Sequence, residues 1–597
     1  MQSPLSSDKG AFAANIPLRK KTRAPIFAWA GLIVVAVLLS YKALDPLASS
    51  FSSASGTTSS DVCPQVPALL PTRNRPIWDA AREHTASDDF KARAVGWLAG
   101  AVRIPTESYD DMQAVGVDPR WDVFRDFHAY LAQAFPLVHA RLTVRKINTY
   151  ALWYEWTGTD TALKPVLLMA HQDVVPVNPA TAADWTHPPF SGYFDGHRIW
   201  GRGSSDNKNG VIGILSAIET LLSIDFVPTR TVVVAFGFDE EVTGSEGAGH
   251  LSAALLEAYE ENAFAFIIDE GGQMFGAIVA LPGVTEKGYM DVVVEVTSPG
   301  GHSSVPPDHT TIGMLAALLV QYENNPYPVH LSRQSVPYQT FQCFAQHSAM
   351  PPAVKALIDS SRTSDAALRA LGALLAQDKL YGSVIRTTQA IDVISGGIKS
   401  NALPEQAHAI VNHRIHTESS VAEVRAHDTA LLAPLAAHFN LTYHAFGVDV
   451  MASASAPGAS GALTLGDMGN VLEPAPVTPT RGLDAAAYDM LAGTIVATYS
   501  TRRLAGPGGD NETVFVAPSI MFANTDTRFY WKLSPNIFRY GHSHGNSVSA
   551  SADLGPDLED MFDGIHTVNE SIDADDFMEL IRFFVTLVLN ADESTTL

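Results

Sequence analysis

The segment Val166-Leu-Leu-Met-Ala-His-Gln-Asp173 combines an apolar run with metal-competent side chains. Its first five residues are apolar, which is typical of a strand buried on both faces. They run directly into His171 and Asp173, whose side chains can bind or orient a metal ion. Two other apolar stretches end in the same way, in Asp239-Glu240-Glu241 and in Asp269-Glu270. We therefore predict buried strands over residues 166–170, 231–238 and 264–268.

A helix predicted over residues 211–222 separates the first two strands. Strand–helix–strand order at this spacing predicts an α/β fold with a central, mostly parallel sheet. The Gly-rich stretch Gly201-Arg-Gly-Ser-Ser-Asp206 lies just before the helix. Side chains that follow neighbouring parallel strands meet at one edge of the sheet, where strands are ~4.8 Å apart.

Each of these motifs has a structural explanation when it is taken alone, such as a helix cap or a solvated turn. Together they gather several carboxylates at one place, and carboxylates that repel one another need a compensating cation. Imidazole and carboxylate ligands suit Zn²⁺ or a similar divalent ion. The sequence therefore predicts a metal site at the carboxyl edge of the sheet.

The pattern changes near Lys287. An alternating strand is predicted over 289–297, followed by a helix over 311–322, an irregular stretch over about 330–379, a strand over 407–415 and a helix over 421–439. This order predicts a smaller α+β domain at 287–450, inserted into a larger domain formed by residues 62–286 and 451–597. The form of residues 451–511 is not predicted.

The N-terminal region predicts a membrane anchor. Residues 24–41 carry no charge and would form ~27 Å of helix, close to the thickness of a bilayer core. Four basic residues precede this stretch, so the positive-inside rule places residues 1–23 in the cytosol and the large C-terminal part in a lumen or outside. A cleaved signal peptide is the alternative. Residues 42–61 are predicted to be a flexible stalk.

The composition narrows the classes of function. The chain has 597 residues and a net charge of −24, and this acidic excess argues against a nucleic-acid partner. Its two cysteines, Cys63 and Cys343, exclude a disulfide scaffold; they allow one bridge, although two free thiols are the simpler expectation. Glycosylation sequons begin at Asn440, Asn511 and Asn569, and the last is expected to be unmodified because it lies in a motif described next.

Several segments together resemble the co-catalytic zinc peptidases, a family that includes carboxypeptidase S, aminoacylase and glutamate carboxypeptidase. The resemblance extends from about residue 90 to the C-terminus. It is carried by His171-Gln-Asp173, Gly201-Arg-Gly-Ser-Ser-Asp206, Asp239-Glu240-Glu241, Asp269, Gly301-His302-Ser-Ser, Gly396-Gly-Ile-Lys-Ser-Asn401-Ala-Leu-Pro, Asn524-Thr-Asp-Thr-Arg528 and His566-Thr-Val-Asn-Glu570.

The resemblance implies two zinc ions per subunit. One would take His171 and Glu241, the other would take Asp269 and His566, and Asp206 would bridge both ions. Asp173 would accept the second N–H of the His171 ring. Glu240 would be the general base that takes a proton from water and later gives it to the leaving amine.

The resemblance also implies a role for the inserted domain as a lid and dimerisation domain. His302 would steady the oxyanion, often in the site of the other subunit, and Asn401 and Arg414 would contact substrate. Arg414 would hold the free C-terminal carboxylate, for which its planar fork is suited. An intramolecular ion pair is the alternative for Arg414. The extra stretch at about 330–379 leaves dimerisation open.

The resulting expectation is a membrane-anchored di-zinc carboxypeptidase that releases C-terminal residues from short peptides in a vacuole-like lumen. An N-acyl-amino-acid hydrolase would use the same metals and the same carboxylate clamp. A non-catalytic, membrane-tethered binding protein is a third interpretation, and the presence of both Glu240 and the whole ligand set argues against it.

Overall fold

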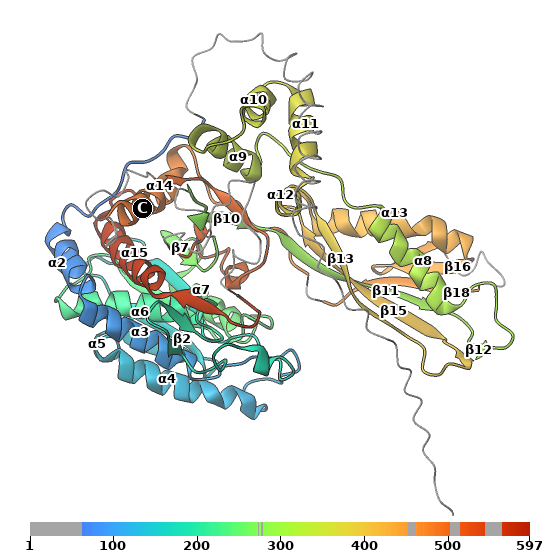
Figure 1. Cartoon of the computed structure of the whole chain (residues 1–597), viewed down its shortest axis with the longest axis horizontal. Coiled ribbons are helices and arrows are strands. Elements are labelled where there is room, and N and C mark those ends of the chain that lie inside the picture. Colours follow the sequence, from blue (N-terminus) through green and yellow to red (C-terminus); the bar gives the residue numbers. More distant parts are fainter. Residues whose placement is uncertain are drawn as a thin grey trace, which may run out of the picture.

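The computed structural model describes residues 62–272, 279–451, 460–469, 471–501, 514–543 and 564–597, together with the backbone of 274–275. Figure 1 shows a larger α/β domain, a smaller domain of sheet and helices beside it, and a group of short helices above the junction of the two. The predicted tail, membrane anchor and stalk, residues 1–61, lie outside the described part. Within that part no helix combines the length and the apolar character needed to cross a membrane.

An eight-stranded sheet with the order β1-β2-β6-β3-β7-β21-β10-β20 forms the centre of the larger domain. The three strands predicted from the sequence are β3, β6 and β7, and their parallel arrangement is confirmed. The sheet is mixed rather than mostly parallel, because β1, β2 and β6 pair antiparallel and β21 pairs antiparallel with β10. The strands are β1 (Thr143–Ile147), β2 (Ala151–Trp156), β3 (Val166–His171), β6 (Val232–Gly237), β7 (Phe266–Asp269), β10 (Gly283–Glu286), β20 (Ser519–Met521) and β21 (Ile537–Arg539).

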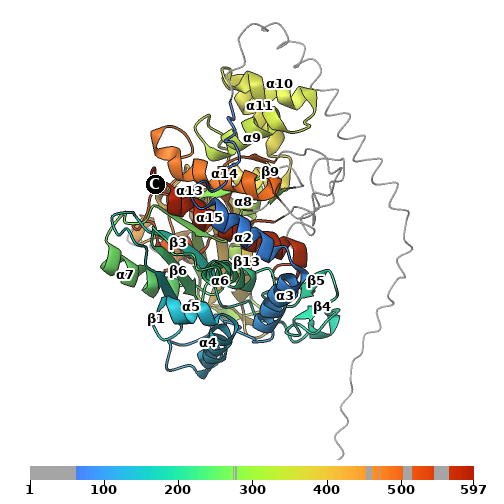
Figure 2. The ribbon, with the colours of Figure 1, turned by 90° about the vertical axis from the view of Figure 1, so that its left-hand side faces the viewer.

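Helices cover both faces of this sheet because alternate residues of its strands point to opposite sides. Leu168 and Ala170 of β3 join one apolar core, whereas Leu167 and Met169 join another. The first core lies beneath a layer of helices that Figure 2 shows side by side, and α7 (Ala248–Tyr259) packs on the second. The helices of the first layer include α2 (Arg75–Thr85), α3 (Asp88–Val102), α4 (Val123–Ala134), α5 (Pro136–Arg141), α6 (Lys208–Ser223), α14 (Ala486–Ser500) and α15 (Ala574–Glu593).

Two small sheets extend the larger domain. The first joins β4 (Tyr193–Phe194), β5 (Arg198–Trp200) and β22 (Ser571–Asp573), and the second joins β8 (Met274–Phe275), β9 (Val279–Ala280) and β19 (Phe515–Val516). The first of these matters for the site, because β5 leads into the Gly-rich stretch that ends at Asp206 and β22 follows Glu570 directly.

The smaller domain is a six-stranded sheet with the order β13-β15-β11-β18-β16-β17. Met290, Val292, Val294 and Val296 alternate along β11 and pack against α8 and α13 on one face. Strand β18 pairs with β11, so this domain continues beyond residue 450, its predicted end. Its elements are β11 (Gly288–Thr297), β12 (Gly301–His302), α8 (Thr311–Asn324), β13 (Thr388–Gly396), β14 (Ala402–Leu403), β15 (Gln406–Ile415), α13 (Val421–His438), β16 (Leu441–Ala445), β17 (Val448–Met451) and β18 (Gly461–Asp467).

The stretch predicted to be irregular, about residues 330–379, is helical, and the prediction was wrong. It forms α9 (Val336–His347), α10 (Pro352–Ser361) and α11 (Asp365–Leu375), and α12 (Lys379–Val384) follows. The side chains of Ser335, Ser364 and Asp378 cap three of these helices. The helices are short and share a small apolar core that includes Phe341, Ile358 and Leu371, so none shows a long amphipathic pattern of its own. We call α9–α12 the helical cap.

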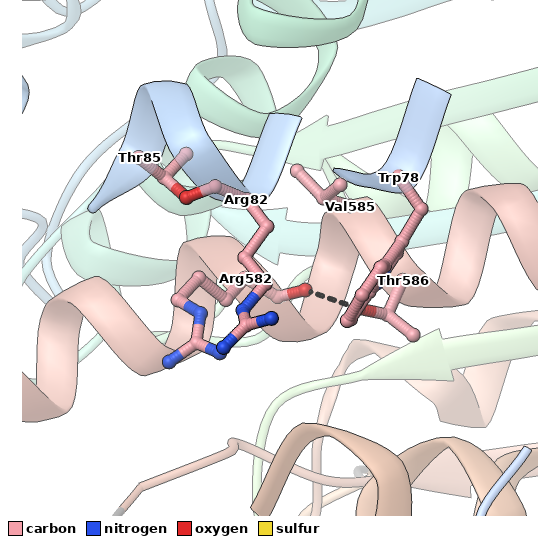
Figure 3. Close-up of a pocket in the computed structure, with 6 residues that line it drawn as sticks. All are labelled: Trp78, Arg82, Thr85, Arg582, Val585 and Thr586. Carbon is pink, nitrogen blue, oxygen red and sulfur yellow. Dashed lines mark hydrogen bonds between the residues drawn. The ribbon is translucent and has the colours of Figure 1, made fainter. Parts of the chain in front are cut away.

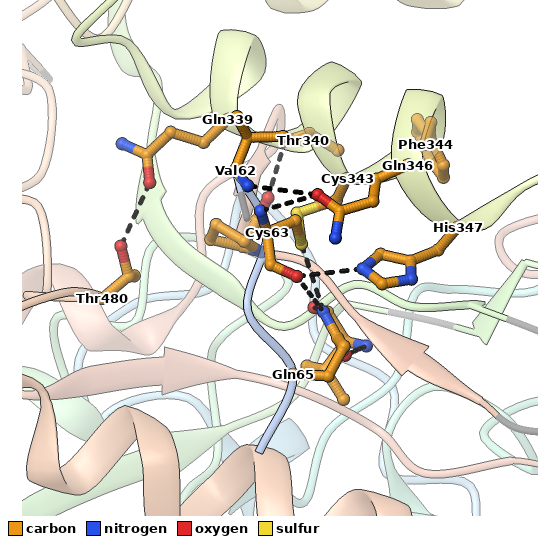
Figure 4. The surroundings of a disulfide bond; sticks show 12 residues. Val62, Cys63, Gln65, Gln339, Thr340, Cys343, Phe344, Gln346, His347 and Thr480 are labelled. Carbon is orange, nitrogen blue, oxygen red and sulfur yellow. Dashed lines mark hydrogen bonds between the residues drawn. A yellow bond between two sulfur atoms is a disulfide. The ribbon is translucent and has the colours of Figure 1, made fainter. Parts of the chain in front are cut away.

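The two cysteines form a disulfide, Cys63–Cys343, which joins the first described residues to α9 (Figure 4). The expectation of two free thiols was therefore wrong. The backbone N–H groups of Val62 and Cys63 each donate to Gln346 Oε1 over 3.1 Å, so the chain is held on α9 by hydrogen bonds as well. The cap in turn contacts the larger domain, where Thr340 Oγ1 donates to the carbonyl of Pro518 at 2.6 Å.

Candidate metal centre

The candidate site lies at the carboxyl ends of the parallel strands. His171 is the last residue of β3, Asp269 is the last residue of β7, and Asp239-Glu240-Glu241 begins two residues after β6 ends. Asp206 comes from the stretch between β5 and α6, and its peptide bond to Asn207 is cis. His566 comes from the loop before β22.

The Asp206 carboxylate lies between two imidazoles. Its Oδ1 is 3.1 Å from Nε2 of His171, and its Oδ2 is 3.1 Å from Nε2 of His566. Glu241 Oε2 is a further 3.1 Å from His566 Nε2. Glu270 Oε2 is 3.3 Å from His171 Nε2. Two imidazoles thus share one carboxylate, and each has a second carboxylate of its own.

The donor set fits divalent metal ions. His171, Asp206 and Glu241 form one group whose ligand atoms all lie within 4.8 Å of one another, and His171, Glu240 and Glu270 form another. Glu241 Oε1 is buried and accepts no hydrogen bond from the protein. Burying a carboxylate oxygen without a hydrogen-bond donor costs free energy, and a cation bound at this place would remove that cost.

Electrostatics lead to the same conclusion. Burial raises the pKa of Glu270 to about 8, and burial together with the nearby carboxylates keeps the pKa of Glu240 well above its usual range. Hydrogen bonds with Asp206 and Glu241 raise the pKa of His566 to about 10. In the absence of a metal, protons therefore supply the positive charge that this group of carboxylates needs.

Asp173 orients two parts of the site through hydrogen bonds. Its Oδ1 is 3.3 Å from His171 Nδ1, the ring nitrogen that faces away from Asp206. Its carboxylate also accepts the backbone N–H groups of Glu240 and Glu241, each over 3.1 Å, and the hydroxyl of Ser108 at 2.7 Å. Asp173 is completely buried and thereby fixes both the ring of His171 and the loop that carries Glu240.

The sequence assigned Asp269 to the second ion together with His566 and did not single out Glu270, which the structure places in contact with His171. Asp269 is buried nearby and its Oδ2 accepts no hydrogen bond, but it belongs to neither potential ligand group. Successive side chains at the end of a strand point to opposite faces, so only one of these two neighbours can face His171. The sequence contains both carboxylates and gives no sign of which one faces the ring. The ligand grouping also differs from the expected one, because Glu241 lies against His566 as well as near His171.

The three predicted substrate-contacting residues lie on the smaller domain, in two separate places. His302 and Asn401 are exposed where β12 and β14 pair, at the end of the smaller domain away from the larger one (Figure 1). They are not brought to the metal centre of the same chain. Arg414, on β15, lies near the domain junction, where its Nη1 donates to Asn524 Oδ1 at 3.1 Å and its guanidinium covers the ring of Tyr289.

A pocket between α2 and α15 is separate from this site (Figure 3). Trp78 lies on one wall and donates its Nε1–H to Thr586 Oγ1 at 3.1 Å. Arg82 and Arg582 also line it, and Arg582 is paired with Glu579. The pocket contains none of the metal-competent side chains described above, so it forms part of the packing between two helices.

Comparison with known proteins decides the family. Residues 167–590 match the family described as Peptidase family M20/M25/M40. The chain belongs to this peptidase family. The matched range contains every residue that contacts Asp206, from His171 to His566, and the chain is accordingly a metal-dependent peptidase.

Relatives of this M20 peptidase include carboxypeptidase S of Saccharomyces cerevisiae, which is 38% identical over 512 residues, 84% of this chain and 85% of that protein. An N-fatty-acyl-amino acid synthase/hydrolase of Mus musculus is 31% identical over 511 residues, 83% of this chain and 87% of that protein. The fold is similar to that of human carnosine dipeptidase 1, with a TM-score of 0.55 at 14% identity, covering 88% of this chain and all of that one. The resemblance inferred from the sequence is thus confirmed.

Proposed function

We propose that this M20 peptidase is a di-zinc carboxypeptidase that releases C-terminal residues from short peptides. The observation that carries the proposal is the Asp206 carboxylate between His171 and His566, each oxygen 3.1 Å from one ring. A carboxylate in this position can bridge two ions, with His171 and Glu270 on one side and His566 and Glu241 on the other. Zinc at these ligands would lower the pKa of a water molecule and polarise the scissile carbonyl.

Glu240 is the proposed general base. It lies in a group with His171 and Glu270, and its backbone N–H is fixed by Asp173. Its raised pKa suits a residue that takes a proton from water and then gives it to the leaving amine. Glu240→Gln keeps the shape of the side chain but cannot accept that proton, so we expect kcat to fall ~10²–10⁴-fold while the zinc content stays the same.

Arg414 is the proposed anchor for the free carboxylate of the substrate. It lies on the smaller domain and contacts Asn524 of the larger one, so a substrate between the domains would meet it. Arg414→Lys keeps the charge but removes the planar pair of donors. We expect it to raise KM for a substrate with a free carboxylate, and we expect no such rise with the corresponding amide.

The name of the mouse relative favours a second candidate, an N-acyl-amino-acid hydrolase. This enzyme would use the same ligands and the same anchor for the free carboxylate. Rates measured on a blocked Gly-Leu dipeptide and on an N-acyl-leucine separate the two. Dominant turnover of the acyl substrate would reject the carboxypeptidase proposal in favour of the hydrolase.

A homodimer through the smaller domain forms part of the proposal. Strand β13 is an edge of the six-stranded sheet, and Val393 and Ile394 on it are 45% and 59% exposed. An exposed edge with apolar side chains favours pairing with a second copy. His302, which is remote from the metal centre of its own chain, would then act at the site of the partner. Light scattering tests this, and a monomeric, fully active protein would contradict it.

We further propose that the protein is anchored in the vacuolar membrane with its catalytic part in the lumen. The Cys63–Cys343 disulfide supports an oxidising compartment. Asn440 lies exposed in the turn between α13 and β16 and is the proposed glycosylation site, whereas Asn569 Oδ1 accepts the Thr186 N–H at 2.7 Å. Fractionation of cells, with glycosidase treatment of wild-type and Asn440→Gln protein, tests these points. A soluble protein without a glycan would contradict them.

Metal analysis tests the centre itself. We expect two zinc ions per chain in the full-length protein and loss of both from Asp206→Ala, because this carboxylate contacts both imidazoles. Two ions retained by Asp206→Ala would reject the bridging role. Asp449→Ala, which removes an exposed acidic residue of the smaller domain, is the control and should keep both ions.

A further inference from the structure

Glu570 connects the two loops that carry Asp206 and His566. It is completely buried and immediately precedes β22. Its Oε1 accepts three backbone N–H groups of the other loop, from Gly203 at 3.0 Å, Ser205 at 2.9 Å and Asp206 at 3.2 Å. A concave group of backbone N–H donors of this kind binds an anion, and here the anion is a side chain of the same protein.

The second carboxylate oxygen of Glu570 is also engaged. Its Oε2 accepts Nη1 of Arg202 at 2.6 Å, and both side chains are almost completely buried. Arg202 Nη2 donates in addition to the carbonyl of Thr567, which follows His566. The same ion pair therefore reaches the loops on both sides of the centre.

The loop that carries His566 needs such support. His566 and Asn569 both have positive φ, 60° and 66°, which is disfavoured for residues with a β-carbon. Asn569 is fixed by its bond to the Thr186 N–H, and the Glu570 carbonyl accepts the Gly201 N–H at 2.9 Å. Strained backbone of this kind persists where its surroundings hold it in place.

We propose that Glu570 is a positioning residue that sets the distance between Asp206 and His566 and thereby the affinity of one metal position. This inference rests on the proposed dinuclear centre. Glu570 contacts the backbone of Asp206 and lies four residues after His566, and it binds no ion itself. Its effect on zinc passes through the placement of these two ligands.

The test compares Glu570→Gln with Glu579→Gln in the full-length protein. Glu579 forms a similar buried pair with Arg582 on α15, at 2.5 Å, but it contacts neither ligand loop. Zinc is titrated into metal-free protein in competition with a chromophoric chelator, and unfolding of the metal-free proteins is followed in parallel. Loss of a residue that orients a metal ligand typically weakens metal binding 10–100-fold.

We expect Glu570→Gln to bind one zinc ion 10–100-fold more weakly than the wild type, and Glu579→Gln to bind both ions with wild-type affinity. Unchanged affinity for both zinc ions in Glu570→Gln would overturn the inference. An equal loss of affinity in Glu570→Gln and Glu579→Gln would also overturn it, because the removal of any buried ion pair would then weaken zinc binding.

A second variant keeps the test decisive if Glu570→Gln does not fold. Glu570→Asp keeps the charge and withdraws the carboxylate from the three N–H donors, so we expect a weakened ion here too; unchanged affinity would overturn the inference. A wild-type protein that binds a single ion would reject the dinuclear centre instead. The affinity for that single ion would then be compared between the wild type and Glu570→Gln, and an unchanged affinity would overturn the inference as well.

Discussion

Two groups of buried carboxylates, one in each domain, are stabilised in opposite ways. In the smaller domain Asp428 is completely buried and contacts four donors, the hydroxyls of Tyr322 and Tyr327 and the rings of His413 and His427. Burial alone would raise its pKa, yet these contacts hold it at about 2. In the larger domain Glu270 and Glu240 lie among other carboxylates, and burial raises their pKa values.

The number of hydrogen-bond donors around a buried carboxylate distinguishes a structural charge, such as Asp428, from a functional one. The protein supplies every donor that Asp428 needs, so its charge is stable without any ligand. Glu240 and Glu270 near His171 have too few donors, and they depend on protons or on a bound cation. The incomplete group is the one that can respond to a metal, and the complete group is the one that holds the fold of its domain.

The largest effect is expected from Asp428→Ala. Removing one member of a buried charged group leaves His413 without its partner, and such changes typically cost ~3–5 kcal/mol. The free energy of unfolding, measured in urea, should fall by that amount with and without zinc. A loss below ~1 kcal/mol would show that Asp428 is not a structural charge, and Asp449→Ala, an exposed change in the same domain, provides the control.

Zinc should stabilise the larger domain only where Asp206 is present. At a free zinc concentration one hundred times the Kd, binding to the folded state adds ~2.7 kcal/mol for each ion. The thermal midpoint of the wild type should therefore rise with zinc, and that of Asp206→Ala should not. An equal rise in both proteins would place the stabilising zinc elsewhere.

His416 is a buried titratable group of the smaller domain without an acidic partner. Burial, together with His330 and Lys287 nearby, lowers its pKa to about 3, whereas the unfolded value is about 6.5. A lowered pKa gives stability that is present above pH 6.5 and is lost as the pH falls. Between pH 6.5 and pH 5 this loss should be about 2 kcal/mol.

His416→Asn removes this titration but can still accept the Glu418 N–H that His416 Nδ1 accepts at 3.1 Å. Urea unfolding at pH 7 and pH 5 should show a smaller acid-induced loss in the variant than in the wild type. His438→Asn, an exposed change on α13, should behave like the wild type. An unchanged pH dependence in His416→Asn would contradict the expectation.

The last effect concerns Glu270 in the metal-free protein. A carboxyl group whose pKa is raised to about 8 gives stability that is present below its unfolded pKa and is lost as the pH rises through 8. Glu270→Gln removes that loss, so the metal-free variant should be more stable than the wild type at pH 8, as urea unfolding of the two metal-free proteins would show. In the presence of zinc the order should reverse, and a variant that is less stable in both states would reject the contrast with Asp428.

The sequence predicted the features that depend on local pattern. The apolar runs that end at His171 and at Asp269 became β3 and β7, and the alternating stretch 289–297 became β11, because burial on two faces or on one leaves a period in the sequence. The antiparallel edges of the central sheet could not be predicted in this way, since the pairing of short strands such as β21 depends on distant contacts.

Features of the site and of the helical cap that depend on distant contacts could not be predicted from local sequence either. Which of Asp269 and Glu270 faces His171 depends on how β7 ends, and Asp428 carries no motif that marks it as the centre of a hydrogen-bonded group. The helices of the cap share one small core, so each is too short to show a periodic pattern alone. The role of Glu570 becomes visible only when its carboxylate is seen beneath the loop of Asp206.

The Cys63–Cys343 disulfide affects how the protein responds to proteolysis. The two cysteines are 280 positions apart in the sequence, and the loop between them includes β3, β6 and β7 with the candidate ligands at their ends. A single proteolytic cut anywhere inside this loop produces two fragments. The disulfide keeps them covalently linked until a reductant is added. Under oxidising conditions the two fragments would therefore stay covalently linked.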